Sequence, residues 1–348
     1  MKAVFLTGRR QMEVRQVPQP TLERPSDVLL RIDTVGVCGS DMHYYRSGRI
    51  GAQVVQYPWI IGHECAGTVV QAGPLVRNLK VGDRVAVDPL DWCGSCDQCA
   101  TGRRHTCRNQ AFLGCPGQTP GSLAEYLVWP AKSCYRIPDT MTAAQATLLE
   151  PFSIGLYAQR LAGRPDGKRI GILGAGPIGL CVLLALKAAG PCQTYVTDLL
   201  DNRLHLARRF GADWTGDPSR LDVPTEVAKH VPPLLDCVFE CAGKQETLDQ
   251  GVELLKPGGL LLMVGIPEHD RISFDMNHLR RKELTLQNVR RQNECIQPAM
   301  DMVSGGKVNL DALATHRFTI DRAQEAFDLV DQYRDGVIKA IVLVSTDS

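Results

Sequence analysis

The chain has 348 residues, of which 44% are hydrophobic and 22% charged, with a formal net charge of +1 at pH 7. This length and apolar content suffice for two domains that each bury a core. The near-zero charge, with basic and acidic residues interleaved, argues against nucleic acid or a membrane surface as partner and favours a small neutral substrate. No apolar run approaches the roughly 18 residues that span a bilayer, and no secretory leader is recognisable, so we expect a cytoplasmic protein without disulfides.

Residues 1–151 are predicted to form a mainly β domain. Short β-like runs at 2–6, 27–32, 67–70 and 83–87 are separated by turn signals. Three potential metal-binding groups lie between or after these runs, namely Cys38, the pair His63 and Glu64, and Glu150. Taken singly, each has an ordinary explanation as a core cysteine or a solvated loop residue. Together, thiolate, imidazole and carboxylate groups from separate loops are what an open catalytic zinc site requires.

A second metal site is predicted at residues 93–107. Its C-x2-C-x2-C-x7-C pattern comprises Cys93, Cys96, Cys99 and Cys107. Four thiolates hold Zn²⁺ in a closed tetrahedral site with no position left for substrate, so this zinc would be structural. The alternative, a pair of disulfides, conflicts with the expected reducing compartment.

Residues 152–289 alternate strand-like and helix-like segments, which is typical of a parallel sheet built from βαβ units. An apolar strand at 169–173 leads directly into Gly174, Gly176 and Gly179 in a G-x-G-x-x-G turn, and an apolar helix follows through Pro177 and Ile178. In this context the pattern predicts a dinucleotide fold, with the pyrophosphate at the helix N-terminus.

The next strand, 193–197, ends at Asp198, whose carboxylate would accept hydrogen bonds from the ribose hydroxyls and repel the 2′-phosphate of NADP. NAD is therefore the predicted cofactor. Arg203 is the first arginine after this aspartate and belongs to the expected cofactor residues. A turn at 256–259 precedes a strand at 260–265, and the backbone of Val264, Gly265 and Ile266 would hold the nicotinamide amide.

Residues 290–348 are expected to rejoin the first domain, with an amphipathic helix at 323–333 and a strand at 338–344. A nucleic-acid-binding zinc ribbon is the alternative class, motivated by the basic lobe residues Arg103, Arg104, His105 and Arg108. The near-zero net charge and the absence of interleaved aromatic residues argue against it.

The chain resembles the zinc-containing medium-chain dehydrogenase family, and within it the polyol (sorbitol) dehydrogenase branch. The similarity extends over essentially the whole sequence and rests on the segments 36–41, 62–64, 81–85, 93–107, 150–151, 174–179 and 256–259, with 38–44 and 48–51 typical of polyol enzymes. The resemblance implies a GroES-like catalytic domain formed by both ends of the chain and a Rossmann NAD-binding domain. It also implies a homo-oligomer, tetrameric or dimeric.

Carried over by residue, the resemblance makes Cys38, His63 and Glu64 the ligands of the catalytic zinc. Glu150 would bind a water beside the metal or reach the metal itself. Cys65, adjacent to Glu64, remains an alternative third ligand. Asp41 would orient the zinc-binding histidine and fix its tautomer.

The family mechanism implies that zinc lowers the pKa of a substrate hydroxyl and that hydride passes to the nicotinamide ring. Ser40 would take the hydroxyl proton and pass it through the NAD ribose to His43, at the solvent end of the relay.

Tyr44 and Arg290 match positions that contact hydroxyl groups of the sugar alcohol in this branch, and Glu150 is also an expected substrate residue. Arg291 stands where the branch commonly has tyrosine, so a sugar-acid substrate remains open beside a neutral polyol. L-Threonine is the nearest enzymatic alternative, because threonine dehydrogenases share these zinc ligands.

Overall fold

A computed structural model describes residues 1–345 of the chain. Two compact units are present: Met1–Glu150 together with the chain from Ile296 onward form one, and Pro151–Cys295 form the other. The first unit therefore combines both ends of the sequence. Residues 290–295, which the sequence pattern groups with the C-terminal part, cluster with the second unit.

The first unit is built around a seven-stranded sheet with the order β11-β7-β6-β3-β19-β18, in which β10 also pairs with β3. These strands are β3 (Asp27–Gly36), β6 (Glu64–Ala72), β7 (Arg84–Val87), β10 (Tyr126–Pro130), β11 (Cys134–Arg136), β18 (Ala314–Thr319) and β19 (Lys339–Leu343). Short two-stranded sheets accompany it, formed by β1 (Lys2–Gly8) with β2 (Gln11–Gln16), β4 (Arg49–Ile50) with β5 (Gln53–Val54), and β8 (Leu90–Asp91) with β9 (Ala111–Phe112).

Strand β3 lies at the centre of this sheet and determines where the metal-binding segments fall. Val28, Leu30 and Ile32 on β3 are completely buried, and such apolar side chains each contribute roughly 1.5–3 kcal/mol when removed from water. The end of β3 pairs with both neighbours, because Gly36 is opposite Glu64 on β6 and opposite Ile341 on β19. A segment from the first quarter of the chain and one from its end therefore meet beside Cys38.

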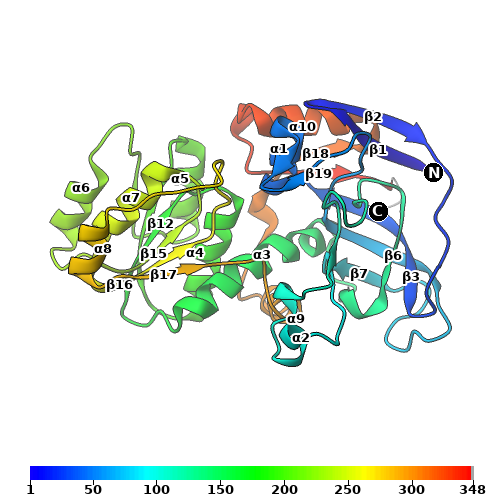
Figure 1. Ribbon diagram of the computed structural model, residues 1–348, viewed down its shortest axis with the longest axis horizontal. Helices are drawn as coiled ribbons and strands as arrows, with labels where there is room; N and C mark the ends of the chain where they lie inside the picture. The colour runs from blue at the N-terminus through cyan, green and yellow to red at the C-terminus, as the bar shows by residue number, and fades with distance from the viewer. Residues whose placement is uncertain (346–348) are drawn as a thin grey trace. The chain divides into compact units, whose positions relative to one another are not determined.

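The helices of the first unit are α1 (Gly39–Ser47), the single turn α2 (Asp97–Ala100), α9 (Ile296–Ser304) and α10 (Ala323–Asp331). Figure 1 shows α10, near the C-terminus, beside α1 and the N-terminal hairpin, and both contacts are present in the structure. Helix α3 (Ala143–Ala162) contains Pro151 and runs through the division between the units.

The second unit is a six-stranded sheet with the order β14-β13-β12-β15-β16-β17, in which every pair is parallel. Its strands are β12 (Arg169–Leu173), β13 (Gln193–Thr197), β14 (Trp214–Gly216), β15 (Leu235–Glu240), β16 (Leu255–Met263) and β17 (Thr285–Asn288). Its helices are α4 (Pro177–Ala189), α5 (Asp201–Arg209), α6 (Val223–His230), α7 (Gln245–Leu254) and α8 (Met276–Lys282). Counted along the chain, the strand order is 3-2-1-4-5-6, which is that of a doubly wound dinucleotide fold. The expected Rossmann and mainly β architecture is confirmed.

Several expected boundaries differ from the structure, among them three in the C-terminal third of the chain. The predicted turn at 256–259 lies within β16, where the register with β15 is interrupted and Gly258 has φ of +74°. Helix α10 ends at Asp331 rather than 333, because Tyr333 adopts a left-handed conformation with φ of +50°. The last strand is one residue shorter at each end than predicted.

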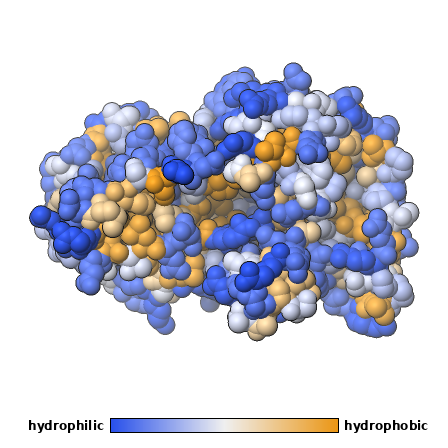
Figure 2. All heavy atoms as spheres, viewed as in Figure 1, coloured by the Kyte–Doolittle hydropathy of each residue, from blue (hydrophilic) through white to orange (hydrophobic). Residues whose placement is uncertain are grey.

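The surface mixes polar and apolar groups on the face shown in Figure 2, where hydrophilic side chains surround small hydrophobic patches in both units. Among the described residues, no helix is both long and apolar enough to cross a membrane.

Candidate functional site

Three metal-binding side chains from two segments of the first unit meet at the end of β3. Cys38 follows β3 and caps α1, whereas His63 and Glu64 stand at the start of β6. One ligand atom from each of these residues lies within 4.8 Å of the other two. His63 and Glu64 are buried and Cys38 is half-buried. A thiol, an imidazole and a carboxylate at this spacing form a donor set suited to zinc.

The imidazole of His63 is oriented by Asp41. Asp41 Oδ1 lies 3.3 Å from His63 Nδ1, and the same oxygen accepts the N–H of Gly62. Burial lowers the pKa of His63, but the charges of Asp41 and Cys38 outweigh it and raise that pKa overall. With Nδ1 turned to the carboxylate, Nε2 is the nitrogen that remains for a metal.

Glu64 is held by a buried lysine that the sequence analysis did not identify. Lys339 Nζ donates to both carboxylate oxygens, at 2.7 and 2.8 Å, and to the carbonyl oxygen of Val37 at 3.0 Å. The Glu64 side chain is 0% exposed and the Lys339 side chain 2%. The ion pair fixes the carboxylate beside Cys38.

The neighbouring thiol of Cys65 is poorly suited to be the third ligand. Consecutive residues on a strand point to opposite faces, so Cys65 points away from the side of β6 that carries Glu64. Burial raises the pKa of Cys65 to about 12, which disfavours the thiolate needed to bind metal.

Glu150 is buried close to this cluster. Burial raises the pKa of Glu150 to about 7, and the nearby charge of His63 opposes that rise. Its carboxyl group therefore loses its proton near neutral pH, as a group that exchanges protons with a ligand would.

Helix α1 carries the expected relay and substrate residues. Ser40 Oγ lies 3.3 Å from Cys38 Sγ and 3.5 Å from His63 Nε2, so the hydroxyl borders the metal-binding cluster. His43 is half-buried and lies three residues along the helix from Ser40, which puts both on one side of α1. Tyr44 is 5% exposed, and its hydroxyl group is 3.3 Å from Gln53 Oε1. A substrate hydroxyl at Tyr44 would have to join or replace Gln53.

The four cysteines of the 93–107 lobe also converge, with their sulfur atoms within 4.8 Å of one another. Cys107 Sγ lies 3.5 Å from Cys93 Sγ and 3.9 Å from Cys96 Sγ. Tetrahedral zinc with bonds of about 2.3 Å separates sulfur atoms by about 3.8 Å, so the spacing fits zinc. The lobe is too short to have its own core. The charged groups of Arg104 and Lys132 lie over the ring of Trp92, 4.1 and 4.5 Å from its centre, and these cation–π contacts help to hold the lobe in place.

The dinucleotide turn lies in the second unit, between β12 and α4. Gly174 has φ of +97°, and a Cβ on Gly179 would lie 1.9 Å from the carbonyl oxygen of Gly174, so only glycine allows the helix to begin this close to the strand. Gly176 is the N-cap of α4 and Pro177 its first residue, while Ile178 follows in the first turn. The N-terminus of a 13-residue helix therefore follows directly on this turn.

Asp198 stands at the end of β13, as the sequence predicts. Its carboxylate accepts the N–H groups of Ala175 at 2.8 Å and Leu200 at 3.0 Å, and Arg203 Nη1 lies 3.5 Å away. The aspartate thus connects the glycine turn to the start of α5. A carboxylate oxygen can accept more than one hydrogen bond, so these contacts leave acceptor capacity for a ribose.

The 264–266 segment follows β16 at the carboxyl end of the sheet. The N–H groups of Val264 and Gly265 both donate to the carbonyl oxygen of Glu240, at 2.8 and 2.9 Å. These N–H groups are therefore engaged within the protein, and Ile266 is 42% exposed.

The two arginines expected to bind substrate lie in the second unit. Arg290 is exposed and Arg291 is half-buried with φ of +53°, whereas Tyr44 belongs to the first unit.

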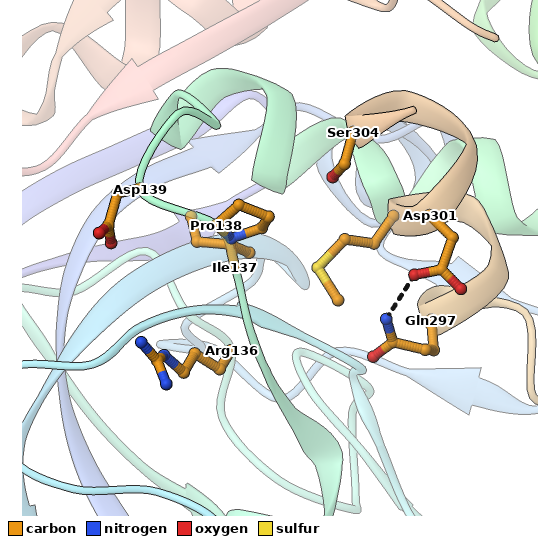
Figure 3. Close-up of a pocket in the computed structure, with 8 residues that line it drawn as sticks. Arg136, Ile137, Pro138, Asp139, Gln297, Asp301 and Ser304 are labelled. Carbon is orange, nitrogen blue, oxygen red and sulfur yellow. Dashed lines mark hydrogen bonds between the residues drawn. The ribbon is translucent and has the colours of Figure 1, made fainter. Parts of the chain in front are cut away.

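One surface pocket of about 450 Å³ lies in the first unit, between the segment after β11 and helix α9. Figure 3 shows Arg136 and Asp139 on one side and Gln297 and Asp301 of α9 on the other, with Gln297 bonded to Asp301 at 2.8 Å. None of the predicted site residues lines this pocket. It is therefore separate from the metal-binding cluster.

Lys339 is the residue of this cluster that the sequence analysis missed. The signal was present, because a lysine in the apolar run 338–344 is out of place unless it has a buried partner.

Comparisons with known proteins agree with this geometry. The model of the alcohol dehydrogenase GroES-like domain matches residues 24–139, and that of the zinc-binding dehydrogenases matches residues 177–305. Sorbitol dehydrogenase from Bos taurus is 38% identical over 92% of this chain and 90% of its own length.

Two solved structures cover 99% of this chain and 99% of their own. An oxidoreductase/dehydrogenase of unknown specificity from Escherichia coli has a TM-score of 0.93 at 32% identity. A putative zinc-binding dehydrogenase from Sinorhizobium meliloti, bound to NADP, has a TM-score of 0.89 at 31% identity. The chain therefore belongs to the zinc-containing medium-chain dehydrogenase family, in its polyol (sorbitol) dehydrogenase branch.

Proposed function

We propose that this protein oxidises a secondary hydroxyl group of a polyol such as sorbitol or xylitol to a ketose, with transfer of hydride to NAD. The observation that carries the proposal is the convergence of Cys38, His63 and Glu64 within 4.8 Å, with Asp41 against the histidine. The sorbitol dehydrogenase of Bos taurus, similar over nearly the whole chain, supports the choice of a polyol.

The catalytic site of the proposal consists of residues from the first unit. Cys38, His63 and Glu64 would hold zinc, which supplies a Lewis acid that makes a hydroxyl group more acidic, while NAD accepts the hydride. Asp41 keeps the His63 ring in one orientation, so that Nε2 faces the cluster. Lys339 keeps Glu64 beside Cys38 and balances its charge.

Proton removal is assigned to side chains on α1 and α3. Ser40 borders the cluster and would receive the substrate proton, and His43, on the same side of α1, would release it to solvent. Glu150, with a pKa raised to about 7 by burial, would hold a water or a substrate hydroxyl beside the metal.

Recognition of the polyol is assigned to Tyr44, Glu150, Arg290 and Arg291. The buried hydroxyl of Tyr44 and the carboxyl of Glu150 suit neutral hydroxyl groups. Two consecutive arginines at 290 and 291 would also suit a carboxylate, which keeps an aldonate as the second candidate. L-Threonine is the third, because its oxidation uses the same set of metal ligands.

NAD rather than NADP is proposed as the cofactor because Asp198 would repel a 2′-phosphate. Gly174, Gly176, Pro177, Ile178 and Gly179 would form the pyrophosphate site, and Val264, Gly265 and Ile266 the nicotinamide side. The NADP bound to the Sinorhizobium meliloti structure makes the rival cofactor worth testing, since Arg203 lies beside Asp198.

A structural zinc at Cys93, Cys96, Cys99 and Cys107 would bring the total to two zinc ions per chain. We further propose that the protein acts in the cytoplasm as a homotetramer or homodimer, which light scattering of the purified protein would test.

The test of the proposed function is a substrate panel with the zinc-loaded enzyme. Values of kcat/KM would be measured for sorbitol, xylitol, galactitol, L-threonine and several aldonates, each with NAD and with NADP. The proposal expects the highest value for a polyol with NAD. Inactivity on every polyol would overturn it, and a preference for an aldonate or for L-threonine would replace the substrate while retaining the zinc chemistry.

A further inference from the structure

Glu240 is a buried carboxylate at the carboxyl end of β15, on the edge of the sheet where the dinucleotide is expected. It is 1% exposed, and none of the functions assigned above uses its side chain. One of its oxygens, Oε1, accepts three hydrogen bonds of 2.7 Å, from the N–H groups of Ala242 and Gly243 and the hydroxyl group of Thr247. A single oxygen with three donors holds the loop after β15 in one conformation.

The same residue also holds the loop after β16. Its backbone oxygen accepts the N–H groups of Val264 and Gly265. A Cβ on Gly265 would lie 2.9 Å from Glu240 Oε2 and 2.3 Å from the nitrogen of Gly243, so the two loops are in direct contact around the carboxylate. Main chain and side chain of Glu240 therefore bind neighbouring loops to each other.

The loop after β15 continues this contact to the glycine turn. The N–H of Cys241 donates to the carbonyl oxygen of Leu173 at 2.8 Å, and a Cβ on Gly174 would lie 3.1 Å from the nitrogen of Ala242. The loops that follow β12, β15 and β16 are thus packed in sequence, with Glu240 between the second and the third. A displacement of Val264 and Gly265 would break their hydrogen bonds to the backbone oxygen of Glu240.

We propose that Glu240 is a positioning residue for the nicotinamide half of the cofactor. It holds the 241–243 loop against the 264–266 segment, and so fixes the backbone that receives the nicotinamide ring without itself touching the cofactor. The inference rests on the proposed use of NAD and adds a residue that sets where the ring lies. The adenine half would be bound at Asp198 and the glycine turn, whereas the hydrogen bonds of the Glu240 carboxylate go to Ala242, Gly243 and Thr247.

The test compares binding of NADH with binding of ADP-ribose, which lacks the nicotinamide ring. Equilibrium titrations of the zinc-loaded protein would be made for the wild type, Glu240→Gln and the control Glu246→Gln, which makes the same charge change at an exposed position of α7. For Glu240→Gln we expect the Kd for NADH to rise about tenfold while that for ADP-ribose changes less than about twofold. The control should bind both ligands like the wild type.

Equal weakening of NADH and ADP-ribose binding by Glu240→Gln, or no change in either, would overturn the proposal. If Glu240→Gln does not fold, Thr247→Val decides in the same way, because it removes one donor to the carboxylate from a partly exposed position. A wild-type protein that binds ADP-ribose and NADH too weakly to measure would instead contradict the proposed function.

Discussion

Lys339→Met is expected to destabilise the zinc-free protein strongly. The substitution keeps a long unbranched side chain but removes the only charge shown bonded to the Glu64 carboxylate among the described residues, together with the bond to Val37. Removing one partner of a fully buried ion pair costs about 3–5 kcal/mol. For a unit of roughly 200 residues this corresponds to a fall in Tm of about 6–20 °C.

Zinc should restore much of the stability that Lys339→Met loses if Glu64 is a metal ligand, because the bound cation replaces the missing positive charge. We therefore expect the increase in Tm on adding zinc to be larger in Lys339→Met than in the wild type. Thermal unfolding would be followed by circular dichroism in chelator and then with zinc. Lys307→Met, which removes an exposed lysine, is the matched control.

Two results would refute this reasoning. In chelator, a Tm for Lys339→Met within about 4 °C of Lys307→Met would mean that the buried ion pair contributes little. An equal zinc-induced increase in Tm in Lys339→Met and in the wild type would mean that bound zinc does not compensate Glu64 for the loss of the lysine charge.

The other expected outcomes concern the cofactor, the lobe and pH. Asp198→Ala should lower kcat/KM for NAD and raise it for NADP, each about tenfold, and an unchanged NAD-to-NADP ratio would contradict the role of this carboxylate. Cys99→Ser should reduce zinc content by one ion per chain, measured by mass spectrometry, and retention of both ions would argue against a four-thiolate site. Since burial raises the pKa of Glu150 to about 7, the fold binds this proton more tightly than the unfolded chain, so the associated stability is present at low pH and is lost as pH rises to about 7. In zinc-free protein, the free energy of unfolding of Glu150→Gln should therefore fall less than that of the wild type between about pH 5 and 8. Urea denaturation at each pH would measure these free energies, and an equal fall in the two proteins would exclude this explanation.

The dinucleotide fold could be predicted closely because its signals are local. The strands at 169–173 and 193–197 have the predicted bounds, since short apolar runs ended by glycine or aspartate identify buried parallel strands. The turn at 256–259 was misplaced relative to β16, because pairing with β15 resumes on both sides of it and the sequence does not show such pairing.

The chemistry of the candidate site could be predicted from residue types, but its geometry could not. Cys38 and Glu64 are brought together by the register of β3 with β6, and Lys339 reaches them because β19 pairs with the other edge of β3. These contacts join residues up to 302 positions apart. Glu240 likewise looks in the sequence like any polar residue at the end of a strand. Its proposed role follows only from the loops that its hydrogen bonds connect.

The most direct test of the whole account is zinc content measured together with NADH formation from a polyol, in the wild type and in Cys38→Ser. The account predicts two zinc ions per chain in the wild type and one in Cys38→Ser, with loss of NADH formation and retention of the zinc in the 93–107 lobe. Undiminished turnover in Cys38→Ser, or a wild type that is fully active without zinc, would contradict it.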